Sequence, residues 1–320
     1  MRSLIEVNAA FPWFFPTVVF VLGAVTGSFL NVCIHRIPVG KSIIHPGSTC
    51  ACGRPIAWYD NIPILSWIIL RGHARCCGRT FSVRYPAIEL LTAVLFLLCW
   101  LQHPPIRAAA GMVFTGMLIC ATFIDFDHMI IPDRFSIGTA VVGVALATLL
   151  PVTGVPLVGD SLTGVALVDA VRGLVTSMIG VLIGSGVVLW IGLLAEVLLR
   201  KEAMGFGDVK LVGAIGAFCG WQGAVFSVFG GAVIGTMAFA VVLLLHGLFG
   251  RKPVPPEPGQ SAAAAESSEE ESSPSGAMGL GVHTPFGPML SAGALVYFLW
   301  LGPTVNTYFA TITQMLFTNF

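Results

Sequence analysis

The stretch MVFTGMLICATFIDFDHMIIPD, residues 112–133, decides the fold class, because a long apolar run ends in it at several acidic side chains. A second stretch, MGFGDVKL at 204–211, places another acidic residue at the start of an apolar run. Charge is scarce in this chain, since 10% of its residues are charged and 56% are hydrophobic. A carboxylate within a bilayer costs roughly 3 kcal/mol and persists mainly where it serves a reaction or an ion path. The sequence therefore predicts a membrane protein with a carboxylate-based site.

Apolar runs long enough to cross about 30 Å of hydrocarbon recur along the chain. They predict an all-α fold, a polytopic membrane helical bundle of about eight transmembrane helices with a small cytoplasmic loop subdomain. The predicted spans are 12–34, 86–101, 108–124, 135–151, 172–199, 209–221, 222–249 and 286–302. The sixth span is short and the seventh long, so the turn predicted at Trp221-Gln222 could lie several residues away. The moderately apolar tail 303–320 is expected to lie along the membrane interface.

Polar segments divide the chain into five predicted parts. These are a first transmembrane helix (1–34), a Cys-containing loop (35–85), a membrane core (86–250), a linker (251–281), and a last transmembrane helix with the tail (282–320). The linker is rich in Pro, Ser, Ala and Glu, and such a composition cannot bury enough apolar surface to offset the entropy of ordering. We therefore expect it to be a disordered tether.

The basic residues indicate how the chain is oriented in the membrane. If the N-terminus lies outside, thirteen Lys and Arg residues fall in the interior segments and three fall outside. Cytoplasmic loops carry such an excess of positive charge. Both acidic stretches then lie on the cytoplasmic side. Topology is a sufficient explanation for the basic clusters, and the neutral net charge argues against a nucleic-acid partner.

Asp125 and Asp208 are predicted to lie at the same membrane depth, at the cytoplasmic ends of two spans. Two carboxyl groups held close in a weakly solvated pocket cannot both ionise, so one retains a proton while the other acts as a base. That pair can activate a water against a peptide carbonyl and protonate the leaving nitrogen. Gly205 and Gly207 lack a Cβ, so they permit a tight turn and a close approach of a substrate backbone to Asp208.

The neighbouring acids have simpler interpretations. A lone Asp at a helix edge is most often an N-cap or a solvated group, and Asp133 in the sequence PDRF is assigned a capping role. Asp127 would point to a different face of a helix from Asp125 and is assigned a supporting role. His128 is interpreted as a polar loop residue. The alternatives to a catalytic pair are a proton-coupled transporter, which would place carboxylates in the middle of spans, and a metalloprotease, for which the sequence lacks an H-E-x-x-H motif.

Six stretches together carry a family resemblance. They are GSFLNVCIHRIP at 27–38, IAWYDNIPILSWIILRG at 56–72, RYPAIELL at 84–91, IDFDHMIIPD at 124–133, MGFGDVKL at 204–211 and TPFGPML at 284–290. In these the chain resembles the type 4 prepilin peptidases, bifunctional enzymes of the bacterial inner membrane that cut and N-methylate prepilins and type II secretion pseudopilins.

The resemblance implies several functional features. The family's catalytic pair would be Asp125 and Asp208. The substrate would be a prepilin with a short basic leader ending in Gly, cut at the cytoplasmic membrane face among the membrane lipids. The 35–85 loop would be associated with methyl transfer from S-adenosylmethionine. No dinucleotide-type glycine fingerprint follows a strand, so a Rossmann methyltransferase domain is not expected, and the cofactor ligands stay unassigned. A peptidase without methyltransferase activity is the alternative.

The cysteines of the first loop depart from the family pattern. The family usually carries two C-x-x-C pairs that look like a zinc ribbon, whereas this chain reads TCACG and HARCCG. The candidate metal ligands are Cys50, Cys52, Cys76 and Cys77. Four thiolates in two clusters could form a tetrahedral zinc site, although adjacent cysteines chelate one metal awkwardly. The alternative is a loop held by packing of Trp58, Tyr59 and Trp67.

Overall fold

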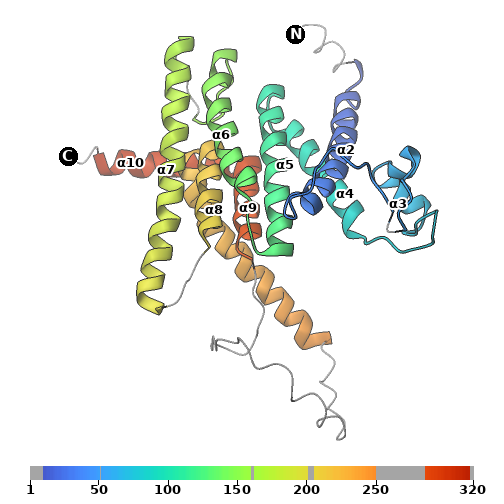
Figure 1. The fold of residues 1–320 in the computed structure, drawn as a ribbon. Coiled ribbons are helices and arrows are strands. Elements are labelled where there is room, and N and C mark those ends of the chain that lie inside the picture. The colour runs from blue at the N-terminus through green and yellow to red at the C-terminus, as the bar shows by residue number, and fades with distance from the viewer. Residues whose placement is uncertain (1–9, 51, 160–161, 201–204, 250–284, 318–320) are drawn as a thin grey trace, which may run out of the picture. The chain divides into compact units, whose positions relative to one another are not determined.

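The computed structural model describes residues 10–50, 52–159, 162–200, 205–249 and 285–317. The linker predicted at 251–281 lies outside these residues. The described residues contain no β-strand, and the chain forms seven helices that are long and apolar enough to cross a membrane (Figure 1). They are α2 (Phe14–Arg36), α4 (Arg84–Gln102), α5 (Pro105–His128), α6 (Asp133–Leu149), α7 (Ala166–Leu199), α8 (Phe206–Phe249), and α9 (Gly287–Val296) continued by η3 (Tyr297–Leu301) and α10 (Gly302–Phe317). The predicted all-α membrane bundle is confirmed.

The chain separates into two compact units. The first consists of Met1–Ile234 together with Pro285–Phe320, and the second is Gly235–Thr284, of which the described part is the end of α8. All the sites described below lie in the first unit.

Helix α8 contains the turn that was expected between the sixth and seventh spans. The backbone breaks at Gly220, where φ is 71° and ψ is 179°, one residue before the predicted position. Beyond the break, the Ser227 hydroxyl donates to the Leu290 carbonyl over 2.8 Å, so this arm packs on the first turn of α9. The described residues thus form seven long apolar helices where about eight spans were predicted, because 209–221 and 222–249 are two arms of the helix that breaks at Gly220.

Glycines bring the helices close together. A Cβ at Gly23 would lie 2.6 Å from the Cα of Ala93, and one at Gly27 would lie 2.7 Å from the Cα of Glu89, so α2 presses on the backbone of α4. Gly180 and Gly216 bring the backbones of α7 and α8 together in the same way. Small residues four apart are typical of helix contacts in membranes, where close packing replaces the hydrophobic effect as the driving force.

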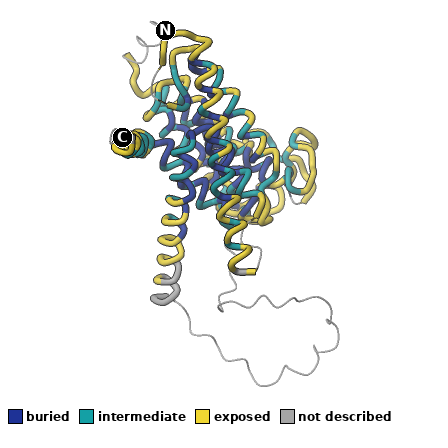
Figure 2. Tube along the Cα trace, turned by 90° about the vertical axis from the view of Figure 1, so that its left-hand side faces the viewer, coloured by how far each residue is buried: buried dark blue, intermediate teal, exposed yellow. Residues whose placement is uncertain are grey.

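The buried residues gather in the interior of the bundle (Figure 2). Phe114 of α5 stacks on Phe218 of α8 with ring centroids 4.5 Å apart, and neither ring is exposed. Large apolar side chains on the outer faces of the helices are exposed, among them Leu182, Trp190 and Leu194 of α7. An apolar outer surface around a close-packed interior is what a bilayer requires of a helical bundle.

The segment between α2 and α4 carries only short elements, which are η1 (Trp58–Asn61), α3 (Leu65–Ile69) and two isolated β-bridges. Glu89 on α4 anchors this loop, because its carboxylate accepts a 2.7 Å hydrogen bond from the Ile64 N–H. Asn31 of α2 donates to the Tyr85 carbonyl at the start of α4. These contacts hold the loop against the same end of the bundle at which α2 ends and α4 begins.

Candidate functional site

Asp125 lies in the last turn of α5, and its side chain is buried. Helix α5 ends at Met129, which adopts the left-handed conformation with φ of 53° and returns its N–H to the Asp125 carbonyl. The Asp125 carboxylate accepts a 3.2 Å hydrogen bond from the N–H of Gly287, the first residue of α9. A Cβ at Gly287 would lie 2.6 Å from Asp125 Oδ2, so a larger residue there would require this carboxylate or the start of α9 to shift.

Asp208 lies in the first turn of α8 and is half-buried. Its N–H bonds the Gly205 carbonyl over 3.1 Å, so the chain turns tightly into the helix. Asp125 acts electrostatically on Asp208. The structure thus brings the two predicted carboxylates to the same end of the bundle.

Ile131, between α5 and α6, lies against the starts of both α8 and α9. A Cβ at Gly207 would lie 3.3 Å from the Ile131 Cβ, and one at Gly287 would lie 3.2 Å from the Ile131 Cδ1. Sequence reasoning did not single out Ile131 or Gly287 as part of the site. The Gly-Pro pair of the TPFGPML stretch was the available signal, since Pro at the start of a helix marks where α9 begins.

The neighbouring acids form ion pairs around this site. Asp127, predicted to be supporting, binds Arg84 of α4 through contacts of 2.6 and 2.7 Å. The capping role predicted for Asp133 is wrong: it is the first residue of α6, forms no cap hydrogen bond, and binds Lys210 of α8 over 2.6 Å. The local sequence suggested a cap, but the lysine that approaches from α8 provides a charged partner. Both pairs join helix ends near the carboxylates.

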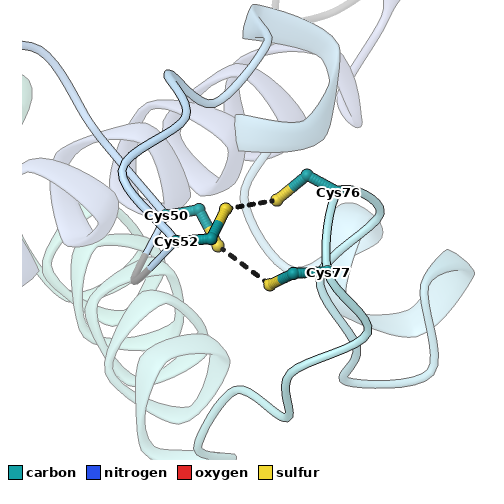
Figure 3. Close-up of side chains that lie close together, drawn as sticks. All are labelled: Cys50, Cys52, Cys76 and Cys77. Carbon is teal, nitrogen blue, oxygen red and sulfur yellow. Dashed lines mark hydrogen bonds between the residues drawn. The ribbon is translucent and has the colours of Figure 1, made fainter.

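The four candidate metal ligands of the first loop converge (Figure 3). The sulfur of Cys50 lies 3.5 Å from that of Cys77, and the sulfur of Cys52 lies 3.4 Å from that of Cys76. All four sulfurs lie within 4.8 Å of one another. Two thiols therefore come from each of two turns and face each other in space.

Each of the two turns is closed by backbone hydrogen bonds. The Cys50 N–H donates to the Arg54 carbonyl over 2.8 Å, and the Ala74 N–H donates to the Arg79 carbonyl over 2.7 Å. Isolated β-bridges flank both turns, at Thr49–Pro55 and His73–Thr80. The two turns are thus similar in build, although the cysteine spacing differs between them.

The aromatic side chains offered as the alternative do not form a common core. Trp58 is 81% exposed and Tyr59 is 50% exposed. Trp67 alone among the three is packed, with Gly72 against its ring and its indole N–H directed at the Phe81 carbonyl over 3.4 Å. The converging thiols therefore carry more of the local organisation than the aromatic rings.

Proton sharing among the thiols follows from their contacts. Hydrogen bonds from the Cys52 backbone and the Cys76 thiol lower the pKa of Cys50 to about 7. The reciprocal contacts with the sulfurs of Cys50 and Cys52 raise the pKa of Cys76 to about 12. The cluster thus favours a Cys50 thiolate, the form in which cysteine binds metals.

Comparison with known proteins assigns the chain to a family. The family model described as the bacterial peptidase A24 N-terminal domain matches residues 21–103, and that of the type IV leader peptidase family matches 112–240. A protein of Klebsiella pneumoniae named prepilin leader peptidase/N-methyltransferase is 35% identical over 225 residues, covering 68% of this chain and 90% of the relative. This chain belongs to the type IV leader peptidase family.

Two further relatives carry the same name. A protein of Aeromonas salmonicida is 30% identical over an alignment that covers 98% of this chain and all of the relative. A protein of Myxococcus xanthus is 37% identical over 70% of this chain, and that match spans 63% of the relative's own length. No solved structure matches the chain.

Each of the two family matches contains one candidate site of the chain. The N-terminal match contains the thiol cluster, and the peptidase match contains the carboxylate pair. The N-terminal match covers most of α2, the cysteine loop and α4, while the peptidase match covers most of α5, all of α6 and α7, and most of α8. Asp125 and Asp208 both fall within the peptidase match, whereas Gly287 lies beyond it.

Proposed function

We propose that this family member is an aspartic endopeptidase that cleaves the leader peptides of type IV prepilins and type II secretion pseudopilins, and then N-methylates the new N-terminal residue. The convergence of Asp125 and Asp208 at one end of the bundle, within the region that matches the leader peptidases, carries the peptidase assignment. The printed names of the relatives support methylation.

Asp125 and Asp208 divide two proton transfers between them. One carboxylate takes a proton from a water as the water attacks the scissile carbonyl, and the other carboxyl group protonates the leaving nitrogen. The Gly287 N–H orients the Asp125 carboxyl group. The Ile131 side chain lies beside Gly207, which precedes Asp208, and beside Gly287, which contacts Asp125, so it adds apolar surface next to the pair.

The substrate backbone approaches beside the start of α8. Gly205 and Gly207 present no side chain there, and a Cβ at Gly205 would meet Asp208 Oδ2 at 3.9 Å. An extended peptide can therefore come close to this carboxylate. The scissile bond of a prepilin joins a basic leader to an apolar helix, and the helix ends that carry the carboxylates match that position at the membrane interface.

The excess of basic residues in the interior segments supports an orientation with the N-terminus outside and the carboxylates facing the cytoplasm. The chain is a multi-pass membrane protein of the bacterial inner membrane, and membrane lipids are proposed as its surroundings. Labelling of a Lys41→Cys variant, at an exposed position of the same loop outside the thiol cluster, with a membrane-impermeant thiol reagent tests the orientation when compared with the unaltered protein. Labelling in inverted vesicles but not in intact spheroplasts is expected, and the reverse pattern would refute the orientation.

S-adenosylmethionine is the proposed methyl donor. When bound, it would supply the methyl group for the new N-terminal amine. The loop between α2 and α4 and the adjoining helix ends are the proposed location, and no residue is assigned as its ligand.

The thiol cluster fits a structural zinc ion. Zinc holds four thiolates tetrahedrally at about 2.3 Å, which separates the sulfurs by roughly 3.8 Å. The observed separations of 3.4 and 3.5 Å, and the limit of 4.8 Å for the whole set, bracket that value. Cys50, Cys52, Cys76 and Cys77 would hold the ion and so join the two turns of the loop.

Incubation of the purified protein with a prepilin in detergent, followed by mass spectrometry of the product N-terminus, tests both activities together. Cleavage with a mass gain of one methyl group is expected. Asp125→Asn and Asp208→Asn should each abolish cleavage, because Asn keeps the shape of Asp but cannot exchange a proton. Asp127→Asn is the matched control and should retain activity, since it loses only a partly exposed ion pair with Arg84. Full cleavage by either Asp125→Asn or Asp208→Asn would refute the assignment, and a cleaved but unmethylated product would indicate a peptidase without methyltransferase activity.

A further inference from the structure

A cavity of about 340 Å³ lies where α4 ends and α5 begins, and its lining includes the loop at Leu157–Gly159, the end of the first arm of α8 and the π-helical turn η3. Ligand cavities in proteins typically measure about 300–1,000 Å³. Arg107 lines it near the start of α5, and Asp125 lies near the end of the same helix. At about 1.5 Å per residue the two are roughly 27 Å apart along α5. The cavity is therefore at the opposite end of the bundle from the carboxylate pair.

Arg107 brings a positive charge to this cavity. Its Nε is shielded from solvent and has no hydrogen-bond partner among the described residues, while its guanidinium lies over the Phe298 ring at 5.9 Å. None of the described residues that line the cavity is acidic. A guanidinium whose Nε is shielded from water and unpaired is stabilised by an anion, and its planar fork matches phosphate oxygens.

Neighbouring groups favour an anion rather than a cation. The Nε2 of His103 lies 3.0 Å from the Phe298 carbonyl, which only accepts hydrogen bonds, so Nε2 carries the proton. Burial and the nearby charge of Arg107 lower the pKa of His103, which leaves Arg107 as the charged group among the described residues of the lining. Asn306 accepts a 2.7 Å hydrogen bond from the Tyr297 hydroxyl with its Oδ1, and its amide N–H groups are then donors. Arg107 also lies in the first turn of α5, where the helix dipole favours negative charge.

The position and the walls of the cavity suggest the source of the anion. The separation of roughly 27 Å along α5 is close to the thickness of the hydrocarbon layer, about 30 Å. If the carboxylates lie at one interface, the cavity lies near the other. Phe218 and Val158 supply apolar walls, and Trp300, which is 48% exposed, stands at the border. Tryptophan is enriched at the level of lipid headgroups. π-Helical turns such as η3 are frequent at functional sites.

We propose that this cavity binds the phosphate group of a phospholipid headgroup, with Arg107 as its main ligand. Native mass spectrometry of the detergent-purified full chain, titrated with dioleoyl phosphatidylglycerol, measures this binding. A galactolipid with the same acyl chains lacks phosphate and serves as the comparison lipid. Inorganic phosphate alone, followed by the shift in unfolding temperature, tests whether the anion comes from solution instead.

Two variants target the cavity. Arg107→Gln removes the charge while keeping hydrogen-bonding capacity, and we expect at least a tenfold loss of affinity for the phospholipid. Gln102→Glu places a carboxylate in the lining at an exposed position where folding is not at risk, and it should weaken binding similarly. Arg172→Gln is the matched control, because Arg172 is exposed near the start of α7 and its charge already interacts with Asp169. Prepilin cleavage by each variant reports that it is folded, since the carboxylate pair is at the other end of the bundle.

Loss of phospholipid binding in Arg107→Gln and Gln102→Glu, but not in Arg172→Gln, would support a lipid headgroup. Binding of inorganic phosphate with the same dependence, and without phospholipid binding, would support phosphate binding but contradict the lipid source. Equal affinity of the wild type and Arg107→Gln for the phospholipid, or equal binding of the galactolipid and the phospholipid, would overturn the proposal.

Discussion

Replacing Gly287 by Ala tests how finely the carboxylate pair is positioned. The new Cβ would lie 2.6 Å from Asp125 Oδ2, 3.3 Å from its Cγ and 3.2 Å from the Ile131 Cδ1. Real Cβ contacts below 3.0 Å are essentially never seen, so the Asp125 carboxylate and the start of α9 must separate by at least 0.4 Å, the difference between 3.0 and 2.6 Å. The hydrogen bond from the Gly287 N–H to Asp125 would be distorted by the same movement.

The size of the effect follows from the size of the displacement. A misplacement of about 1 Å at a reacting group can lower the rate by roughly 10²-fold. A shift of 0.4 Å or more should then lower kcat by about tenfold or more, or roughly 1.4 kcal/mol in the activation free energy. Because Asp125 acts in the chemical step, KM should change little. Alanine suits the first turn of a helix better than glycine does, so the loss should not come from unfolding.

Steady-state cleavage of a prepilin, with the melting temperature measured in parallel, is the assay. Gly138→Ala is the matched control, because it is also a helical glycine but nothing lies within 4 Å of the Cβ position. The control should keep the wild-type rate. If Gly287→Ala cleaves as fast as Gly138→Ala, the glycine does not position Asp125, and the geometry proposed for the pair is wrong.

Gly207→Val should lower the cleavage rate in membranes by about tenfold or more, because a misplacement of about 1 Å at a reacting group can lower the rate roughly 10²-fold. The valine side chain would meet Ile131, whose Cβ already lies 3.3 Å from the position of the new Cβ. Unchanged turnover would mean that the substrate approaches from another side. Metal analysis of the purified protein should find about one zinc per chain, which is the stoichiometry of a four-thiolate site, and the Cys77→Ser variant should contain no bound zinc. Purified protein that is free of metal but fully active would contradict a structural zinc site. Lys210→Met should leave cleavage nearly unchanged and lower the free energy of unfolding by at most about 1 kcal/mol, because its partner Asp133 is 62% exposed and exposed ion pairs contribute little. A loss of activity without a change in melting temperature would instead assign the ion pair a role in the reaction.

The sequence by itself determined the class of fold and the candidate chemistry. Span length depends on the local composition of the chain, so the apolar runs located most helix ends to within a few residues. The exceptions are α7, which begins at Ala166 rather than at 172, and the last span, which continues through α10 to Phe317. The turn within α8 was predicted at Trp221-Gln222 and lies at Gly220. Carboxylates at the edges of apolar runs are equally local signals, and they identified Asp125 and Asp208. The four loop thiols were found in the same way, from residue type and rough spacing.

Only the tertiary structure decided which of these groups meet and what surrounds them. The contact of Gly287 with Asp125 joins residues far apart in the sequence, and it exists because α9 begins beside the end of α5. Asp133 looked like a cap because capping is decided by neighbours along the chain, yet its partner Lys210 comes from another helix. The cavity at Arg107 likewise depends on how α4, α5, α8 and η3 pack. Hydrophobic length is a property of a segment, whereas a site depends on distances between segments, and close glycine packing between helices sets those distances.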